Sequence, residues 1–205
     1  MIRQKQQYWA VIIFSLAFFL LTGCGTTPPS RYYMLNSIPE ATITKPRDPN
    51  EVNVQIGVGP VTVPKYLDRY PIIKRSNGAE VIIDDMNRWA EPLVDNFTRV
   101  LADNLYLLVD GADISIYPWQ NQNTIDYQVV VDVLRFDADL NNNITLSAHW
   151  TILSKAGEQT LYKQKTLIKE KAGGGDYASL VSTQSEATKK LSQQIADKLK
   201  EMIAL

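Results

Sequence analysis

The sequence predicts an α+β domain: a largely antiparallel β-sheet with two amphipathic α-helices packed on one face. Two observations predict it. Several segments alternate apolar and polar residues with a period of two, as half-buried strands do, and two others repeat apolar residues every three or four positions, as amphipathic helices do. The order is strands, helix, strands, helix. Since the apolar stripe of a helix must be covered by another layer, a sheet face is its simplest partner.

The first half of the chain contains short strands separated by turn residues. Gly59-Pro60 is expected to interrupt one of them, because proline cannot donate to a sheet ladder. Asn77-Gly78 favours a tight hairpin, because both residues tolerate positive φ. The expected strands of this half span residues 32–35, 52–58, 61–63, 72–75 and 80–83.

Two amphipathic helices are expected. The first spans about residues 90–108, with Pro92 in its first turn and Gly111 just after its end. Three glycines, 173–175, break the chain before the second helix, and Asp176 is placed to cap it. The apolar stripe of this final helix consists of Tyr177, Leu180, Val181, Ala187, Leu191, Ile195, Leu199 and Met202.

Four more strands are expected between the helices. Residues 126–136 are apolar on both faces, which predicts a central, covered strand. Residues 160–170 are more polar, which predicts an edge strand, and a turn at 155–158 joins it to the preceding strand. The expected strands of this half span residues 114–117, 126–136, 144–153 and 160–170.

The N-terminus has the pattern of a secretory signal. Arg3 and Lys5 precede an apolar run over residues 9–21, which is shorter than the roughly 20 residues of a comfortable membrane span. The run ends at Leu21-Thr22-Gly23-Cys24, which resembles a bacterial lipoprotein signal. The resemblance implies cleavage of the signal peptide, residues 1–23, and lipidation of Cys24 with palmitate-type acyl chains. The alternative is an uncleaved N-terminal anchor with an incidental cysteine.

The residues after Cys24 predict where the mature protein lies. Gly25 stands where aspartate favours retention at the inner membrane, so the same resemblance implies an outer-membrane, lipid-anchored protein on the periplasmic face. Residues 24–30 form the lipidated cysteine and a short tether, whose six residues after Cys24 reach roughly 20 Å. The folded domain, residues 31–205, is therefore expected close to the bilayer.

Composition excludes some partners. Removing residues 1–23 from the 205 leaves 182, with 19 Lys and Arg against 22 Asp and Glu, a formal balance of −3. This size fits one domain. The absence of a basic excess makes nucleic acid an unexpected partner, and no polybasic segment stands beside the anchor.

The sequence lacks a recognisable catalytic set. His149 is the only histidine and Cys24 the only cysteine, so a Ser-His-Asp or Cys-His arrangement has little to draw on. His149 lies on the polar side of its strand with Thr145, Ser147 and Thr151 and is expected to be exposed and uninvolved. We therefore expect a protein that is not an enzyme and that binds no cofactor.

Two acidic segments were weighed as sites. Residues 137–143 resemble the start of a calcium loop, but Asn142 stands where glycine is needed, and a polar hairpin loop is the better interpretation. Asp84, Asp85 and Glu91 flank the expected helix start, where carboxylates are favoured by unpaired N–H groups. We expect no metal site.

The candidate contacts for a partner protein lie at two corners of the chain. A strand ends at a proline and is followed by aromatic, apolar and charged residues, and a second corner combines tryptophan with glutamate. Aromatic and arginine side chains often serve as contact anchors. The alternative is a tryptophan at the edge of the core with a local ion pair. The candidate residues are Pro64, Tyr66, Leu67, Asp68, Arg69, Trp89 and Glu91.

Several of these stretches together carry a family resemblance. The lipoprotein signal, Tyr32-Tyr33-Met34-Leu35, residues 61–67 and residues 89–93 occur in the order found in the ABC-type transport auxiliary lipoprotein family, which this chain resembles over nearly its whole mature length. The resemblance implies a non-catalytic accessory of intermembrane lipid transport that docks an MCE-domain periplasmic protein, rooted in the inner membrane through its partner, to the outer membrane. It leaves assembly into a homo-oligomeric ring open.

Other functions remain as alternatives at this point. A regulatory or structural lipoprotein could contact a peptidoglycan synthase or a cell-wall scaffold. A periplasmic hydrolase is disfavoured because the sequence lacks a nucleophile–base set. Direct carriage of lipid inside the domain is a fourth alternative.

Overall fold

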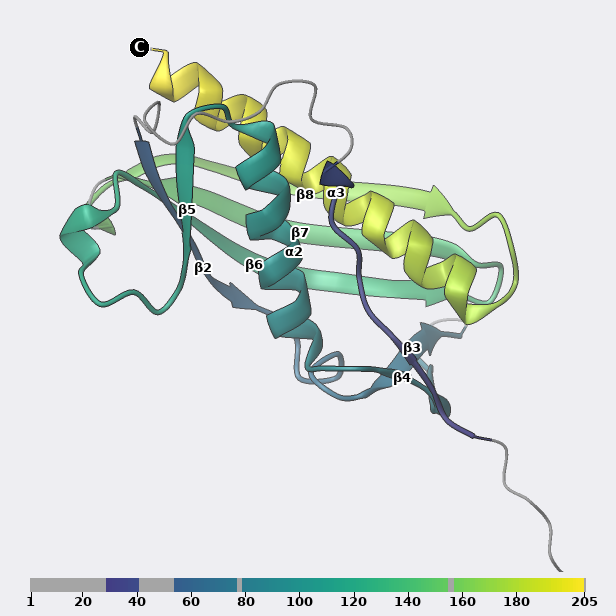
Figure 1. Cartoon of the computed structure of the whole chain (residues 1–205). Helices are drawn as coiled ribbons and strands as arrows, with labels where there is room; N and C mark the ends of the chain where they lie inside the picture. Colours follow the sequence, from purple (N-terminus) through teal and green to yellow (C-terminus); the bar gives the residue numbers. More distant parts are fainter. Residues whose placement is uncertain (1–28, 41–53, 77–78, 155–156, 205) are drawn as a thin grey trace, which may run out of the picture.

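The computed structural model describes residues 29–40, 54–76, 79–154 and 157–204. Within these residues the chain forms an eight-stranded sheet with two long helices on one face, so the predicted α+β class is confirmed (Figure 1). The strands are β1 (Arg31–Tyr33), β2 (Val54–Thr62), β3 (Pro71–Arg75), β4 (Val81–Trp89), β5 (Ala112–Ile116), β6 (Tyr127–Asp139), β7 (Asn143–Leu153) and β8 (Thr160–Lys171). The helices are α2 (Leu93–Leu108), α3 (Tyr177–Ile203) and the short 3-10 turn η3 (Gln122–Thr124).

Strand β6 is the centre of the sheet. It continues through β7 and β8 as an antiparallel meander, and β3 and β4 form an antiparallel hairpin, which confirms the largely antiparallel prediction. The remaining pairings, β1 with β4, β2 with β5 and β6, and β3 with β6, are parallel. Parallel neighbours need a long connection between them, which the hairpin and α2 supply between β2 and β5.

The core lies between the sheet and the helices. Alternate residues of β7 face the helices and are buried: Ile144, Leu146, Ala148, Trp150 and Ile152. Strand β8 pairs only with β7 among the described strands, as expected of an edge. Phe97 of α2 meets Phe136 of β6 edge to face, with ring centroids 5.5 Å apart. Such pairs add to the free energy gained from burying both rings. The apolar stripes of the two helices therefore meet the same face of the sheet.

The first helix begins later than predicted. Strand β4 runs to Trp89, and α2 starts at Leu93 rather than near residue 90, with the Pro92 carbonyl accepting from the N–H groups of Asp95 and Asn96 at 3.1 Å each. The reason lies in Glu91, because a residue before proline is pushed away from helical φ/ψ. The second helix begins as predicted: the Ser179 N–H donates to the Asp176 carboxylate at 2.8 Å.

The predicted break at Gly59-Pro60 is a bulge inside one strand. Strand β2 runs unbroken from Val54 to Thr62, and its register against β6 shifts between Val58 and Val61. Gly59 has φ +120°, and a Cβ added there would lie 2.7 Å from the Cβ of Tyr117. Only glycine fits this backbone and this close approach.

The predicted hairpin is also present. Beyond the β3–β4 ladder, the Ser76 N–H donates to the Glu80 carbonyl at 3.0 Å. The Asn77-Gly78 pair itself lies outside the described residues, as do Val52 and part of the predicted 155–158 turn.

The segment after β1 crosses the helical layer and is held there by side chains. The backbone N–H of Leu35 donates to Asn96 at 2.6 Å, and that of Ile38 donates to Asn104 at 2.8 Å. Both asparagines are buried in α2, so these bonds satisfy donors that would otherwise lack partners. The start of the domain is therefore fixed to α2. Among the described helices, none has the length and apolarity needed to span a membrane.

Candidate functional site

The loop between β2 and β3, residues 64–70, contains most of the predicted contact residues. The Pro64 carbonyl accepts from the N–H groups of Leu67 at 2.8 Å and Asp68 at 3.2 Å, which closes a tight turn. Leu67 is only 3% exposed and packs in the core, while Asp68 and Arg69 extend into solvent. The buried leucine therefore holds the loop in place, and the charged pair is what the loop presents.

A buried carboxylate fixes the same loop from beneath. The side chain of Asp137 in β6 is 0% exposed, and the Tyr66 hydroxyl donates to its Oδ2 at 3.2 Å. Arg75 donates to Oδ2 through Nη2 at 3.1 Å, and Arg135 donates to Oδ1 through Nε at 2.8 Å. Burial and the Asp137 charge both raise the pKa of Tyr66, which keeps its hydroxyl protonated as a donor.

We name these four residues, Tyr66, Arg75, Arg135 and Asp137, the Asp137 cluster. The two guanidinium groups neutralise the buried charge, and the Arg75 guanidinium also lies 5.6 Å from the centre of the Tyr66 ring. The cluster joins the loop, β3 and β6. Its members come from distant parts of the chain, so the sequence alone did not reveal it.

The second corner belongs to the core. Trp89 is 3% exposed, and its backbone N–H donates to the Tyr70 carbonyl at 2.7 Å. Glu91 accepts from both terminal nitrogens of Arg99 in a bidentate ion pair. Arg99 holds the pKa of Glu91 below its usual range. These side chains match the alternative expected from the sequence, a tryptophan at the core with a local ion pair.

The predicted contact residues therefore differ in exposure, and Pro64, Tyr66 and Glu91 are half-buried. Leu67 and Trp89 are buried and support the fold, while Asp68 and Arg69 are exposed beside Tyr70. Tyr70 was not predicted, and the Arg88 guanidinium lies 5.9 Å from its ring centre. Partner binding by any of these residues stays a prediction.

The acidic segments that were weighed as sites are structural. Asp139 accepts from the N–H groups of Asn141 and Asn143 at 2.8 Å each, and Asn142 between them has φ 61°. This is the polar hairpin loop that was expected, between β6 and β7. No group of three or more potential ligands, His, Cys, Asp or Glu, gathers within the described part of the chain.

The prediction for Asp84 and Asp85 was wrong. Both lie in strand β4 rather than at a helix entry, because the strand continues to Trp89. Burial raises the pKa of Asp84, but hydrogen bonds from the Met86 N–H and the Asn87 amide outweigh it and lower the pKa overall. Asp84 therefore stabilises the part of β4 where its register against β3 shifts.

Two other predictions concern His149 and Cys24. His149 is half-buried rather than exposed as predicted, and it lies in β7 on the sheet face away from the helices. Cys24 and the tether up to residue 28 lie outside the described residues, so lipidation and cleavage stay predictions. The described chain begins at residue 29, two residues before β1.

Comparison with known proteins identifies relatives. Residues 33–196 match the family described as ABC-type transport auxiliary lipoprotein component. Two curated relatives, each named intermembrane transport lipoprotein PqiC, come from Escherichia coli (strain K12) and Shigella flexneri. Each is 25% identical over 146 residues, which cover 70% of this chain and 73% of the relative.

Solved structures share the fold. The crystal structure of an uncharacterised protein has a TM-score of 0.70 at 20% identity and covers 84% of this chain and 99% of its own. A protein of Xanthomonas campestris has a TM-score of 0.62 at 14% identity and covers 81% and 92%. At these identities the two structures support the architecture of the domain and nothing finer.

Proposed function

This chain belongs to the ABC-type transport auxiliary lipoprotein component family, and on that premise we propose that it is an outer-membrane lipoprotein acting in intermembrane lipid transport. In this proposal it is a non-catalytic docking subunit for a periplasmic MCE-domain protein, which is itself rooted in the inner membrane through its partner. The family match over residues 33–196 is the observation that carries the proposal, and the name of the two PqiC relatives supports it.

The proposed anchor is a lipid on Cys24. Each buried CH₂ contributes about 0.8 kcal/mol, so several acyl chains together hold a protein to a membrane without spontaneous release. The first strand begins at Arg31, seven positions after Cys24. A tether of that length keeps the domain within roughly 20 Å of the bilayer, where docking to the outer membrane has to occur.

The proposed docking surface is the exposed part of the 64–70 loop, with Asp68, Arg69 and Tyr70. Leu67 packs in the core beneath this loop, and the Asp137 cluster ties the loop to β3 and β6. A loop already fixed in one conformation loses little entropy when it binds, which favours its use as a contact.

A pull-down tests the docking surface. We would exchange the charges of the loop with Asp68→Arg and Arg69→Asp, and as a matched control exchange those of the exposed α3 pair with Glu186→Lys and Lys189→Glu. Both variants keep the net charge. The loop variant should recover at least about tenfold less MCE-domain protein from detergent-solubilised membranes, since contact hot spots cost 1–2 kcal/mol or more, and the α3 variant should match wild type.

Other results would change the assignment. Equal recovery by both variants would remove the loop as the docking surface. Recovery of a peptidoglycan synthase or cell-wall scaffold instead of an MCE-domain protein would favour the regulatory alternative. Deletion of the protein that leaves the outer-membrane lipid balance unchanged would overturn the transport role.

A further inference from the structure

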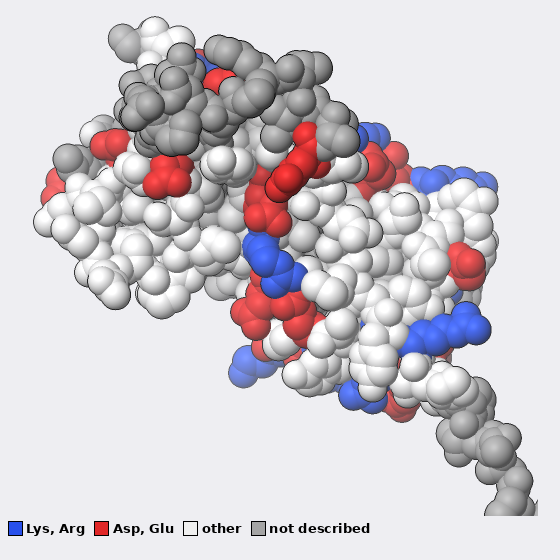
Figure 2. Space-filling model, in the orientation of Figure 1, with Lys and Arg blue, Asp and Glu red and all other residues white. Residues whose placement is uncertain are grey.

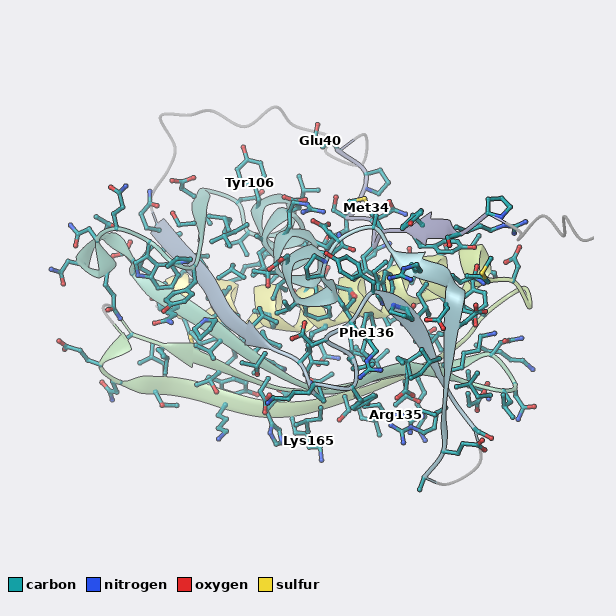
Figure 3. The ribbon with its side chains drawn as sticks, turned by 90° about the horizontal axis from the view of Figure 1, so that it is seen from below. Met34, Glu40, Tyr106, Arg135, Phe136 and Lys165 are labelled. Atoms are coloured by element: carbon teal, nitrogen blue, oxygen red, sulfur yellow. The ribbon has the colours of Figure 1, made fainter. Side chains whose placement is uncertain are left out.

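One face of the sheet is left open by the helices. Phe136 of β6 points toward α2 and α3, while Arg135 of the same strand and Lys165 of β8 extend from the opposite side (Figure 3). The exposed side chains of β8 on this side are therefore available to a partner.

The outward positions of β8 contain only two residue types. Alternate residues of a strand point to opposite faces, and in β8 one set packs toward the helices while the other is exposed. We name the exposed set the β8 face: Leu161, Lys163, Lys165, Leu167, Lys169 and Lys171. Its two leucines are 40% and 59% exposed, which is unusual for side chains of this size.

The lysines of the β8 face are free to meet an outside charge. None of the four forms an ion pair within the described residues. The acidic groups of β6 on this side are already engaged: Asp137 is buried under two arginines, and Asp132 accepts from the Thr62 hydroxyl at 2.6 Å. Four cations and two exposed leucines in one row therefore form a basic, amphipathic surface.

We propose that the β8 face rests on a leaflet of anionic phospholipid. The inference rests on the proposed lipid anchor at Cys24, because the tether keeps the domain within roughly 20 Å of a bilayer. Lysine stems lie along apolar surface while their ammonium groups reach the phosphates, and the leucines enter the boundary between headgroups and acyl chains. The anchor holds the protein at the membrane, and the β8 face sets which side of the domain faces the lipid.

The test reads orientation, because the acyl chains dominate total binding. Full-length lipidated protein is placed in vesicles of phosphatidylcholine alone or with 30% phosphatidylglycerol. A polarity-sensitive dye is attached through Leu161→Cys or, as a control, through Ser182→Cys on the exposed side of α3. Quenching of each dye by nitroxide-labelled lipid measures its contact with the leaflet.

We expect quenching of the dye at position 161 but not of the dye at position 182. The quenching should require phosphatidylglycerol and should be lost reversibly in 0.5 M salt, because salt screens exposed charges. Adding Lys165→Gln and Lys169→Gln should lower the ratio of docked to undocked protein about 30-fold, whereas Lys189→Gln with Lys200→Gln should leave it unchanged. A protein that floats with the vesicles while the dye at 161 stays in water overturns this inference and leaves the anchor standing. Equal quenching in both vesicle types overturns the electrostatic basis, and failure to float overturns the anchor and this inference together.

Discussion

The surface of α2 and the β8 face of this domain carry opposite charge. A run of acidic side chains around a basic one crosses the helical face (Figure 2). The hydrogen bond from Arg99 to Glu91 raises the pKa of Arg99 most, and the charges of Glu91, Asp103 and Asp95 raise it further. The sheet face has the lysines of β8. The formal net charge of −1 hides this separation, so the overall charge of the chain says little about which partner each face can meet.

The two faces also differ in how their charges are used. On the helical face the arginine is held in a bidentate pair, and the acids surround it. On the sheet face Arg75 and Arg135 both pair with the buried Asp137. The β8 lysines form no ion pair among the described residues. The arginine of the α2 surface is therefore paired within the domain, while the β8 lysines can pair with a partner.

The largest effect is expected at the boundary between the loop and the sheet face. Asp137→Ala leaves Arg75 and Arg135 without their shared carboxylate and should lower the free energy of unfolding by about 1.5–3 kcal/mol, as loss of hydrogen bonds to a charged group does; both arginines are partly exposed, so neither is left as a fully buried charge. Urea denaturation measures it. The exposed Asp132→Ala serves as control and should change stability by about 0.5 kcal/mol. Similar values for the two variants would mean that the cluster does not hold the loop.

An intermediate effect is expected on the helical face as pH falls. Arg99 lowers the pKa of Glu91, so the pair stabilises the fold above the ordinary glutamate pKa of 4.5, and this contribution is lost as pH drops through the lowered value. Both side chains are partly exposed, so the loss should be about 0.5 kcal/mol. The free energy of unfolding of Glu91→Gln should not show this loss between pH 5 and 3, as measured by denaturation at each pH. Parallel curves for variant and wild type would contradict the assignment.

The smallest effect is expected at Asp103, where the substitution should stabilise the domain rather than destabilise it. Burial and the nearby charge of Glu40 raise the pKa of Asp103, so its ionised form is unfavourable in the folded protein. Asp103→Asn should stabilise the domain by about 0.3 kcal/mol at pH 7, and the difference should vanish below the ordinary pKa of 3.8. If Asp103→Asn instead destabilises the domain at pH 7, the neighbours of Asp103 stabilise its ionised form, which contradicts this assignment.

The sequence predicted most of the fold because most elements have a clear period. The stripe of β7, the edge position of β8 and the Asp176 cap follow from local patterns that the tertiary structure retains. Two boundaries were wrong for reasons that depend on neighbours in space. Gly59 continues a strand because Tyr117 lies against it, and β4 extends past Asp84 before α2 begins.

The candidate surfaces were harder to predict. Leu67 and Trp89 looked like contacts because their burial depends on packing between distant segments. The Asp137 cluster was missed for the same reason, since Tyr66 and Arg75 stand 71 and 62 positions before the carboxylate that they bind. The β8 lysines alternate with inward-facing residues, so they do not form a basic run. A search for basic residues at every second position of a predicted edge strand could have found them.

The most direct test of the account is the intact mass of the mature protein extracted from its own membranes. We expect a chain that begins at Cys24 and carries the added mass of a diacylglyceryl group and a further acyl chain. An unmodified terminus on protein recovered free of the membrane would contradict the anchor, and with it the assignment of this domain as a docking subunit at the bilayer.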